Sequence, residues 1–255
     1  MKAKILAIAQ QKGGVGKTTT AINLGAALIE RQYKVLLVDL DPQGALSAGL
    51  GLEPENLDQT IYTVLHDPNV QLSSIIIQTE SKAHIAPANI DLSASELELV
   101  SEPGRERILG EKLSPLVQVY DYILIDCPPS LGLLTLNALS TANGVIIPVQ
   151  TQYFSLRGMG LLERTINKVK GRLNPHLHVV GILPTIHHGR TLHAREVLND
   201  LQQTYGNKMF ETIIPQTVQF ADSVMAGQSI LQLSPKTNAA TAYRNLAMEV
   251  ENRVK

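Results

Sequence analysis

Short apolar runs alternate along the chain with longer segments whose apolar residues recur at helical spacing. The runs that predict strands buried on both faces are residues 5–9, 35–38, 122–125, 144–149 and 179–183. The segments that predict helices are residues 18–31, 131–141, 156–172, 192–205 and 238–254. Because these strands are followed by helices, the pattern predicts an α/β fold. We expect a doubly wound, mostly parallel sheet with helices on both faces.

The segment 51–118 is less regular and offers only two short strand candidates, residues 75–77 and 84–86. The 255 residues would allow two domains, but no linker rich in proline, glycine and serine divides the chain. We therefore expect one domain over residues 1–255.

Composition excludes several classes of protein. No run approaches the roughly 18 apolar residues of a membrane-spanning helix, and no signal-peptide pattern opens the chain. The single cysteine, Cys127, rules out an internal disulfide framework, and we read it as a small buried residue. We expect a cytoplasmic protein without membrane insertion.

Charge is distributed unevenly, although the formal net charge is only −1. Residues 1–156 hold 10 Lys/Arg and 16 Asp/Glu, a balance of −6, whereas residues 157–255 hold 12 and 7, a balance of +5. Composition alone leaves open a polyanion-binding face and an ordinary variation of surface charge.

A glycine-rich loop joins the first predicted strand to the first predicted helix. Its glycines let backbone N–H groups approach phosphates, and the helix N-terminus adds further donors. Lys17 would contact the β- and γ-phosphates, and the hydroxyl of Thr18 would bind Mg²⁺. The loop therefore predicts an ATP and Mg²⁺ site formed by Gly13, Gly14, Val15, Gly16, Lys17, Thr18 and Thr19.

Two further strands end in aspartates. Asp41 follows the strand at 35–38, and its carboxylate would orient the attacking water or hold a magnesium-bound one. Capping of the next helix is the alternative that the residues leave open for Asp41. Asp126 ends the strand at 122–125, so it lies at the carboxyl end of a predicted parallel strand.

The loop departs from the common P-loop pattern at two positions. Gln11 stands where a glycine is usual, and Lys12 adds a second lysine. In this respect the loop resembles the deviant Walker A loop of the ParA/MinD family of P-loop NTPases, and similarity to ParA/Soj-type partition ATPases extends from Lys4 to Val250. The resemblance implies an ATPase that forms a homodimer around ATP, in which Lys12 reaches the partner's phosphates. It also implies that Asp41 supports hydrolysis. The segment 123–130 resembles the family's Walker B region, which implies that Asp126 holds Mg²⁺ through water.

The resemblance also implies contacts outside the loop. Pro215 would line the base, and Thr217 replaces a common asparagine near the adenine. Gln216 and Gln219 stand where arginines that bind DNA nonspecifically are expected, which weakens that surface or shifts it. The basic residues that we assign to DNA binding are Arg190, which matches a DNA-contacting arginine of the family, together with Arg195, Lys208 and Lys236.

The function that we expect is ATP-dependent partition or positioning of a cargo on DNA. The ATP-bound dimer would bind nucleoid DNA nonspecifically, and an adaptor protein would stimulate hydrolysis and release it. The cargo could be a plasmid, a chromosome origin or a protein organelle.

Two alternatives remain open: a MinD-like ATPase on a membrane surface and an ATP-dependent metabolic enzyme. The helix predicted at 238–254 suits packing on the domain better than membrane binding. A cluster of His187, His188 and His193, with His176 and His178 nearby, predicts a solvated loop rather than a zinc site, since no further ligand of fixed geometry is evident.

Overall fold

The computed structural model describes residues 2–151, 155–189 and 191–254. Its seven strands form one sheet in the order β3-β4-β2-β5-β1-β6-β7, and all neighbours pair in parallel except β3 with β4. The strands are β1 Lys4–Ile8, β2 Val35–Asp39, β3 Ile77–Gln78, β4 His84–Ala86, β5 Tyr122–Asp126, β6 Gly144–Gln150 and β7 His178–Thr185. The predicted doubly wound α/β fold is confirmed.

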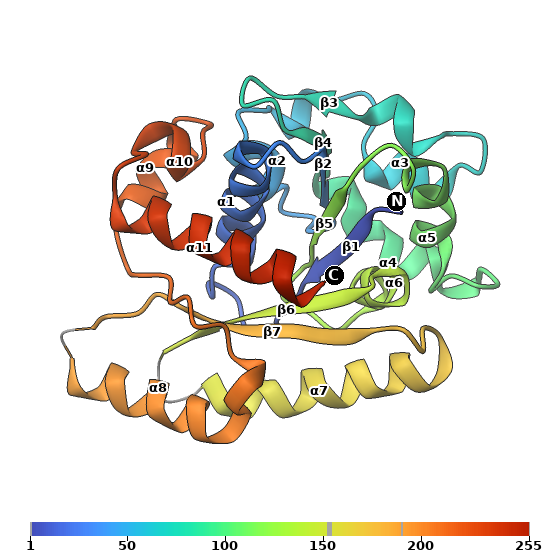
Figure 1. Ribbon diagram of the computed structural model, residues 1–255. Helices are drawn as coiled ribbons and strands as arrows, with labels where there is room; N and C mark the ends of the chain where they lie inside the picture. The colour runs from blue at the N-terminus through green and yellow to red at the C-terminus, as the bar shows by residue number, and fades with distance from the viewer. Residues whose placement is uncertain (1, 152–154, 190, 255) are drawn as a thin grey trace.

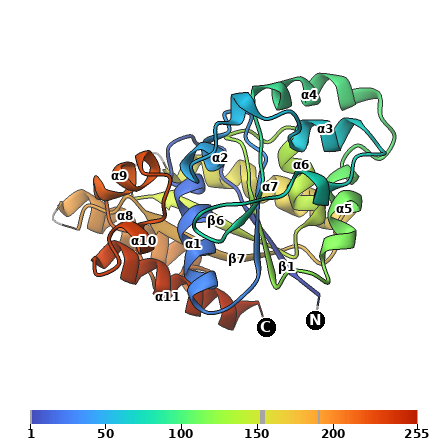
Figure 2. The same cartoon turned by 90° about the horizontal axis from the view of Figure 1, so that it is seen from above.

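Helices cover both faces of this sheet (Figures 1 and 2). The α-helices are α1 Lys17–Glu30, α2 Ala45–Gly49, α3 Ile61–His66, α4 Ser95–Glu98, α5 Ile108–Leu113, α6 Leu133–Thr141, α7 Ser155–Arg172, α8 Leu192–Tyr205, α9 Gln219–Met225, α10 Ile230–Leu233 and α11 Asn238–Arg253. Short 3₁₀ helices span Pro54–Asn56 (η1), Leu72–Ile75 (η2), Ile90–Ala94 (η3), Leu99–Ser101 (η4), Ser114–Leu116 (η5) and Gly206–Lys208 (η6).

The core is divided by the sheet into two apolar layers, because successive side chains of a strand point to opposite faces. On β5, Ile123 and Ile125 belong to the layer beneath α5, α6 and α7, whereas Leu124 belongs to the layer beneath α1 and α11. Both layers consist of buried apolar side chains, which explains why these strands read as continuous apolar runs.

The helix α11 packs along α1, in line with the expectation that the last helix packs on the domain. Tyr243, Leu246 and Val250 are almost completely buried there. Two ion pairs join the same helices at their exposed edge, Arg244 with Glu30 and Arg31 with Glu251. Among the helices that the structure describes, none has the length and apolar character needed to cross a bilayer.

The strand predicted at 75–77 is misplaced. Ile75 ends the 3₁₀ helix η2, and the strand begins only at Ile77. A tight turn follows, in which the Thr79 amide donates to the Ala83 carbonyl and Lys82 takes a left-handed φ of 64°. This turn folds the segment into an antiparallel hairpin at the sheet edge and limits β3 to two residues.

Candidate nucleotide-binding site

Three adjacent strands carry the candidate site at their carboxyl ends. The last residues of β1, β5 and β2 lie side by side in the sheet, with Ile8 opposite Asp126 and Asp126 opposite Asp39. The glycine loop leaves β1 at this edge, and Asp41 follows β2 two residues later. Parallel pairing therefore brings the loop and the aspartates together.

Glycines give the loop its shape. Gly14 and Gly16 have φ values of 69° and 86°, in the left-handed region that glycine enters without strain. Gly16 is also the N-cap of α1 and has no side chain to block the first N–H groups of the helix. Between them, Val15 is buried, and its carbonyl accepts a 2.8 Å hydrogen bond from the hydroxyl of Thr185. Val15 thus anchors the loop to β7 and does not line the cavity.

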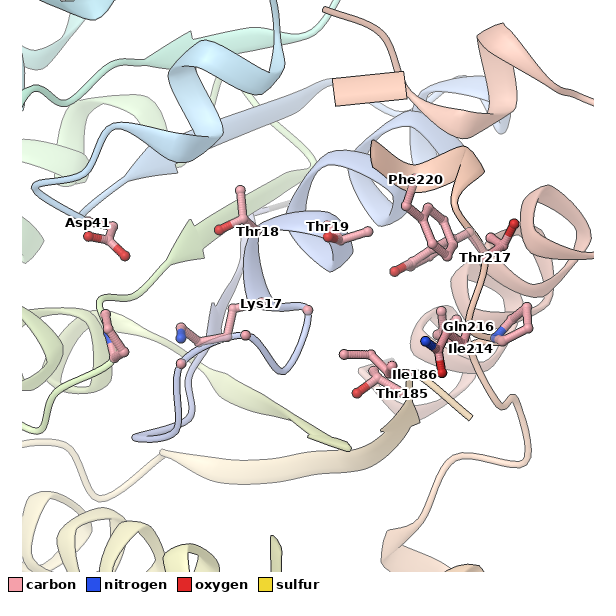
Figure 3. A pocket seen from close by; sticks show the side chains of 16 residues that line it. Lys17, Thr18, Thr19, Asp41, Thr185, Ile186, Ile214, Gln216, Thr217 and Phe220 are labelled. Carbon is pink, nitrogen blue, oxygen red and sulfur yellow. The ribbon is translucent and has the colours of Figure 1, made fainter. Parts of the chain in front are cut away.

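A cavity of about 410 Å³ opens above the loop, within the roughly 300–1,000 Å³ of small-molecule sites. In Figure 3, Lys17, Thr18 and Asp41 lie along one side and face Ile186, Ile214 and Phe220 across the cavity. The cavity also includes the predicted residues Gly13, Gly14, Gly16, Thr19, Pro215 and Thr217.

Asp126 lies behind Thr18 and has one oxygen without a partner. The Thr18 hydroxyl donates to Asp126 Oδ2 at 2.7 Å, whereas Oδ1 has no hydrogen-bond partner among the described residues. Burial, with the neighbouring charge of Asp39 next, raises the pKa of this carboxyl well above its ordinary value. A hydrated divalent cation beside Thr18 would satisfy the orphaned oxygen, so the residues fit a Mg²⁺ site.

Asp39 is a buried residue of the site that the sequence did not single out. It is completely buried, and its Oδ2 accepts from both the amide and the hydroxyl of Ser47 at 2.9 and 2.8 Å. Its Oδ1 accepts from the amide of Asp41 at 3.1 Å. Burial raises the pKa of Asp39 to about 7, against the opposing effect of the Ser47 hydrogen bonds. Asp39 therefore fixes the backbone that carries Asp41. The feature of the sequence that could have indicated this role is its position two residues before Asp41.

Asp41 itself lines the cavity and is half-buried. Its Oδ1 accepts from the Gln43 amide at 3.0 Å. The alternative of a helix cap finds no support, because the N-cap of α2 is Gly44 and the first-turn amide of Ser47 is taken by Asp39. The carboxylate of Asp41 is therefore placed beside the phosphate loop.

The apolar wall of the cavity comes from three separate segments. Phe220 and Tyr243 meet edge to face, with ring centroids 5.8 Å apart, and Ile214 lies beside them. Ile186, after β7, takes a φ of 51°, a strained conformation for a β-branched residue. Tyr243 belongs to the helix that the sequence predicts at 238–254, and its aromatic side chain was the available signal for a place in this wall.

Lys12 does not line the cavity of its own chain. Its side chain is exposed, and Nζ donates to Gln150 Oε1 at 3.3 Å. Lys12 is thus directed to the molecular surface, whereas Lys17 is buried.

Among the residues assigned to DNA binding, Arg195 and Lys208 lie at opposite ends of α8. Arg190 lies outside the described residues, and Arg195, Lys208 and Lys236 are all exposed. Arg195 lies in the first turn of α8 and Lys208 follows its end, so 13 residues of mostly helical chain, roughly 20 Å, separate them. Of the two glutamines, Gln216 lines the nucleotide cavity and Gln219 begins α9.

The histidines are divided between the two ends of β7. His187 lies near the cavity and its Nδ1 pairs with the Thr151 hydroxyl at 3.1 Å, whereas His176 and His178 lie at the start of the strand. Burial and the nearby charges of His188 and Arg195 lower the pKa of His187. Across residues 2–151, 155–189 and 191–254, no group of three or more metal-binding side chains comes together. Cys127 is buried, and burial raises the pKa of its thiol.

Comparison with known proteins gives the family. A family model described as an AAA domain matches residues 3–179. The sporulation initiation inhibitor protein Soj of Bacillus subtilis is 42% identical over 247 residues, 97% of this chain and 98% of that protein. The chromosome-partitioning ATPase Soj of Thermus thermophilus is 43% identical over 255 residues, 99% of this chain and 97% of that protein.

Solved structures agree with this result. A cobyrinic acid a,c-diamide synthase from Mycobacterium smegmatis, with bound ADP and magnesium, is similar with a TM-score of 0.86 and 41% identity, covering 96% of this chain and 93% of that one. The cell division ATPase MinD of Pyrococcus furiosus is similar with a TM-score of 0.80 and 25% identity, covering 98% and 99%. With a matching family model and Soj relatives along nearly its whole length, the chain belongs to the Soj/ParA family of P-loop partitioning ATPases.

Proposed function

We propose that this protein is an ATP-dependent partition ATPase that dimerises on ATP, binds DNA nonspecifically and leaves it after hydrolysis stimulated by an adaptor protein. The observation that carries the proposal is the cavity itself. It joins the buried Lys17, the Thr18–Asp126 pair with its orphaned oxygen, and Asp41 at one edge of the sheet. A phosphate chain, a divalent cation and an attacking water need this set of groups.

The residues of the chain divide the work of hydrolysis. Backbone N–H groups of the loop and Lys17 bind the phosphates, and the wall of Ile214, Phe220 and Tyr243 holds the base. Thr18 and Asp126 would hold Mg²⁺, which supplies positive charge to the β- and γ-phosphates when bound. Asp41 orients the water, and Asp39 fixes the backbone of Asp41.

The position of Lys12 favours ATP hydrolysis in a dimer, in which each chain contributes to the site of the other. Its exposed side chain lies outside its own cavity, so it can reach the phosphates of a second protomer. A cation supplied by a partner acts as an arginine finger does, by offsetting negative charge that develops in the transition state. ATP would therefore promote the dimer, and hydrolysis would weaken it. We place this cycle in the cytoplasm, on nucleoid DNA.

The test is ATP-dependent retention on DNA, measured together with turnover. We expect Asp41→Ala to bind ATP and stay on DNA-coated beads with turnover reduced at least tenfold, because release needs hydrolysis. Lys17→Ala should lose both nucleotide and DNA. The exposed Asp58→Ala is the matched control and should behave as the parent. The proposal would be refuted if the parent protein did not stay on the DNA-coated beads in the presence of ATP.

A second candidate function, an ATP-dependent synthase of small molecules, is favoured by one observation, the 41% identity to the cobyrinic acid a,c-diamide synthase. In that case ATP turnover would depend on a small acid such as cobyrinic acid, and adding DNA would not change it. A membrane-surface role is less supported, because the apolar side of α11 is buried against α1.

A further inference from the structure

The end of the cavity away from the phosphate loop has an uncharged lining. Figure 3 shows Gln216 and Thr217 at this end, close to Ile214. Lys17 and Asp41 lie at the opposite end, and they are the charged side chains among the described residues that line the cavity. The base of a nucleotide whose phosphates lie on the loop would therefore meet apolar and neutral polar groups.

Most polar side chains near this end are already engaged in hydrogen bonds. The Thr185 hydroxyl donates to the Val15 carbonyl at 2.8 Å. The Tyr243 hydroxyl lies 3.4 Å from that of Thr20, within hydrogen-bonding distance. The Thr217 hydroxyl oxygen accepts from the first backbone amide of α9 at 3.3 Å. Each of these hydroxyls therefore has a partner within the protein.

Gln216 combines a free side chain with a fixed backbone. Its side chain is exposed, and its carboxamide has no hydrogen-bond partner among the described residues. Its backbone amide donates to the His187 carbonyl at 3.1 Å, and the His187 amide donates to the Ile214 carbonyl at 3.1 Å. The His187 ring is held in turn by the Thr151 hydroxyl at 3.1 Å. The carboxamide therefore extends from a fixed segment beside the apolar wall of the cavity.

The chemistry of a carboxamide distinguishes one purine from the other. It offers one donor and one acceptor side by side. Adenine carries the matching pair, because its N6 amino group donates and N7 beside it accepts, whereas guanine presents two acceptors, N7 and O6, which suit an arginine. The two donors of guanine, N1–H and the N2 amino group, would suit a carboxylate, and the described residues at this end include none. Glutamine at position 216, where an arginine is expected from the resemblance, therefore favours adenine.

We propose that Gln216 selects the base of the nucleotide: its carboxamide accepts from the N6 amino group of adenine and donates to the ring nitrogen beside it. This inference rests on the proposed function, since it concerns the nucleotide of that site. Gln216 is thus a specificity-determining residue, distinct from Lys17, Thr18 and Asp41 at the phosphate end. Its substitution should change which nucleotide binds and leave the phosphate contacts intact.

The experiment compares the dissociation constants of ADP, GDP and purine riboside diphosphate, measured by calorimetry with Mg²⁺. Purine riboside lacks the amino group of adenine, so its affinity relative to that of ADP reports the N6 contact alone. One neutral hydrogen bond corresponds to roughly two- to tenfold in affinity, and the parent should prefer ADP to purine riboside diphosphate by about this factor.

Two substitutions of Gln216 test the role of its carboxamide. Gln216→Leu should bind ADP and purine riboside diphosphate equally well. Gln216→Glu should shift the preference from ADP towards GDP, because a carboxylate accepts from both guanine donors. The matched control is Gln219→Leu, whose position does not line the cavity, and it should keep the preferences of the parent. Ratios within one variant are compared, so a general loss of affinity does not enter.

The assignment would be overturned if the parent bound ADP and purine riboside diphosphate equally well, or if Gln216→Leu kept the preference of the parent. It would also be overturned if the control lost the preference as fully as Gln216→Leu. In these cases binding of ADP persists, and the proposed function stands. A parent that binds none of the three nucleotides would refute the proposed function first.

Discussion

The buried carboxyl of Asp39 makes the stability of the nucleotide-free protein depend on pH. Burial raises its pKa from 3.8 to about 7, so between these values the folded state holds a proton that the unfolded chain has released. Stability contributed by this proton is complete below about pH 4, falls as pH rises and is lost above about pH 7. A shift of about 3 units at 1.36 kcal/mol each gives a total of about 4 kcal/mol.

The perturbation is Asp39→Asn, which removes the titrating group. Asparagine supplies one acceptor oxygen where the carboxylate supplies two, so one donor among Asp41 and Ser47 loses its partner, at a cost of about 1–3 kcal/mol at every pH. Between pH 5.5 and 7 the free energy of unfolding of the parent should fall by about 2 kcal/mol because Asp39 loses its proton. The variant should not show this part of the fall with pH. The pKa of Asp126 is raised mainly by burial and also by the charge of Asp39, so Asp126 contributes to the pH dependence of both proteins and contributes less in the variant.

The assay is urea unfolding at a series of pH values from 5.5 to 8, without nucleotide or magnesium. The control is Ser47→Ala, which keeps the carboxylate and removes a hydroxyl that holds the pKa of Asp39 down. Its free energy of unfolding should therefore fall with pH at least as steeply as that of the parent. Parallel curves for the parent and Asp39→Asn would show that Asp39 does not titrate in this range and would refute the reasoning.

Two further predictions concern the dimer and the core. Lys12→Ala should stay monomeric with ATP in light scattering while still binding the nucleotide, because Lys12 lies outside its own cavity and Lys17 within it; an ATP-induced dimer of this variant would remove the role in trans. Gly144→Ala should destabilise the fold by about 1–3 kcal/mol in urea unfolding, because its Cβ would lie 2.3 Å from the stiff side chain of Val180. The control Gly171→Ala, on an exposed helical position with open space, should be neutral or stabilising by up to about 1 kcal/mol, and equal losses in both variants would contradict the packing argument.

The local pattern of apolar and polar residues was sufficient to predict most of the fold and the phosphate-binding part of the site. The strands at β1, β2, β5, β6 and β7 follow from apolar runs, since a strand buried on both faces must be apolar throughout. The loop from Gly13 to Thr19 was predictable from its own glycines and Lys17, although Thr185 of β7 also holds it through the Val15 carbonyl. Short elements such as β3 were not predictable in the same way, because a two-residue edge strand depends on the hairpin turn that pairs it with β4.

The phosphate loop, the two strand-end aspartates and the order of strands and helices could be predicted without a structure, because each depends on residues that are neighbours in the chain. The remaining features depend on contacts between distant segments. The base wall joins Ile186, Phe220 and Tyr243 from three segments, and the role of Asp39 depends on donors that the fold brings to it. Asp39 and Asp126 are likewise far apart in the sequence and lie side by side only because parallel strands align their carboxyl ends.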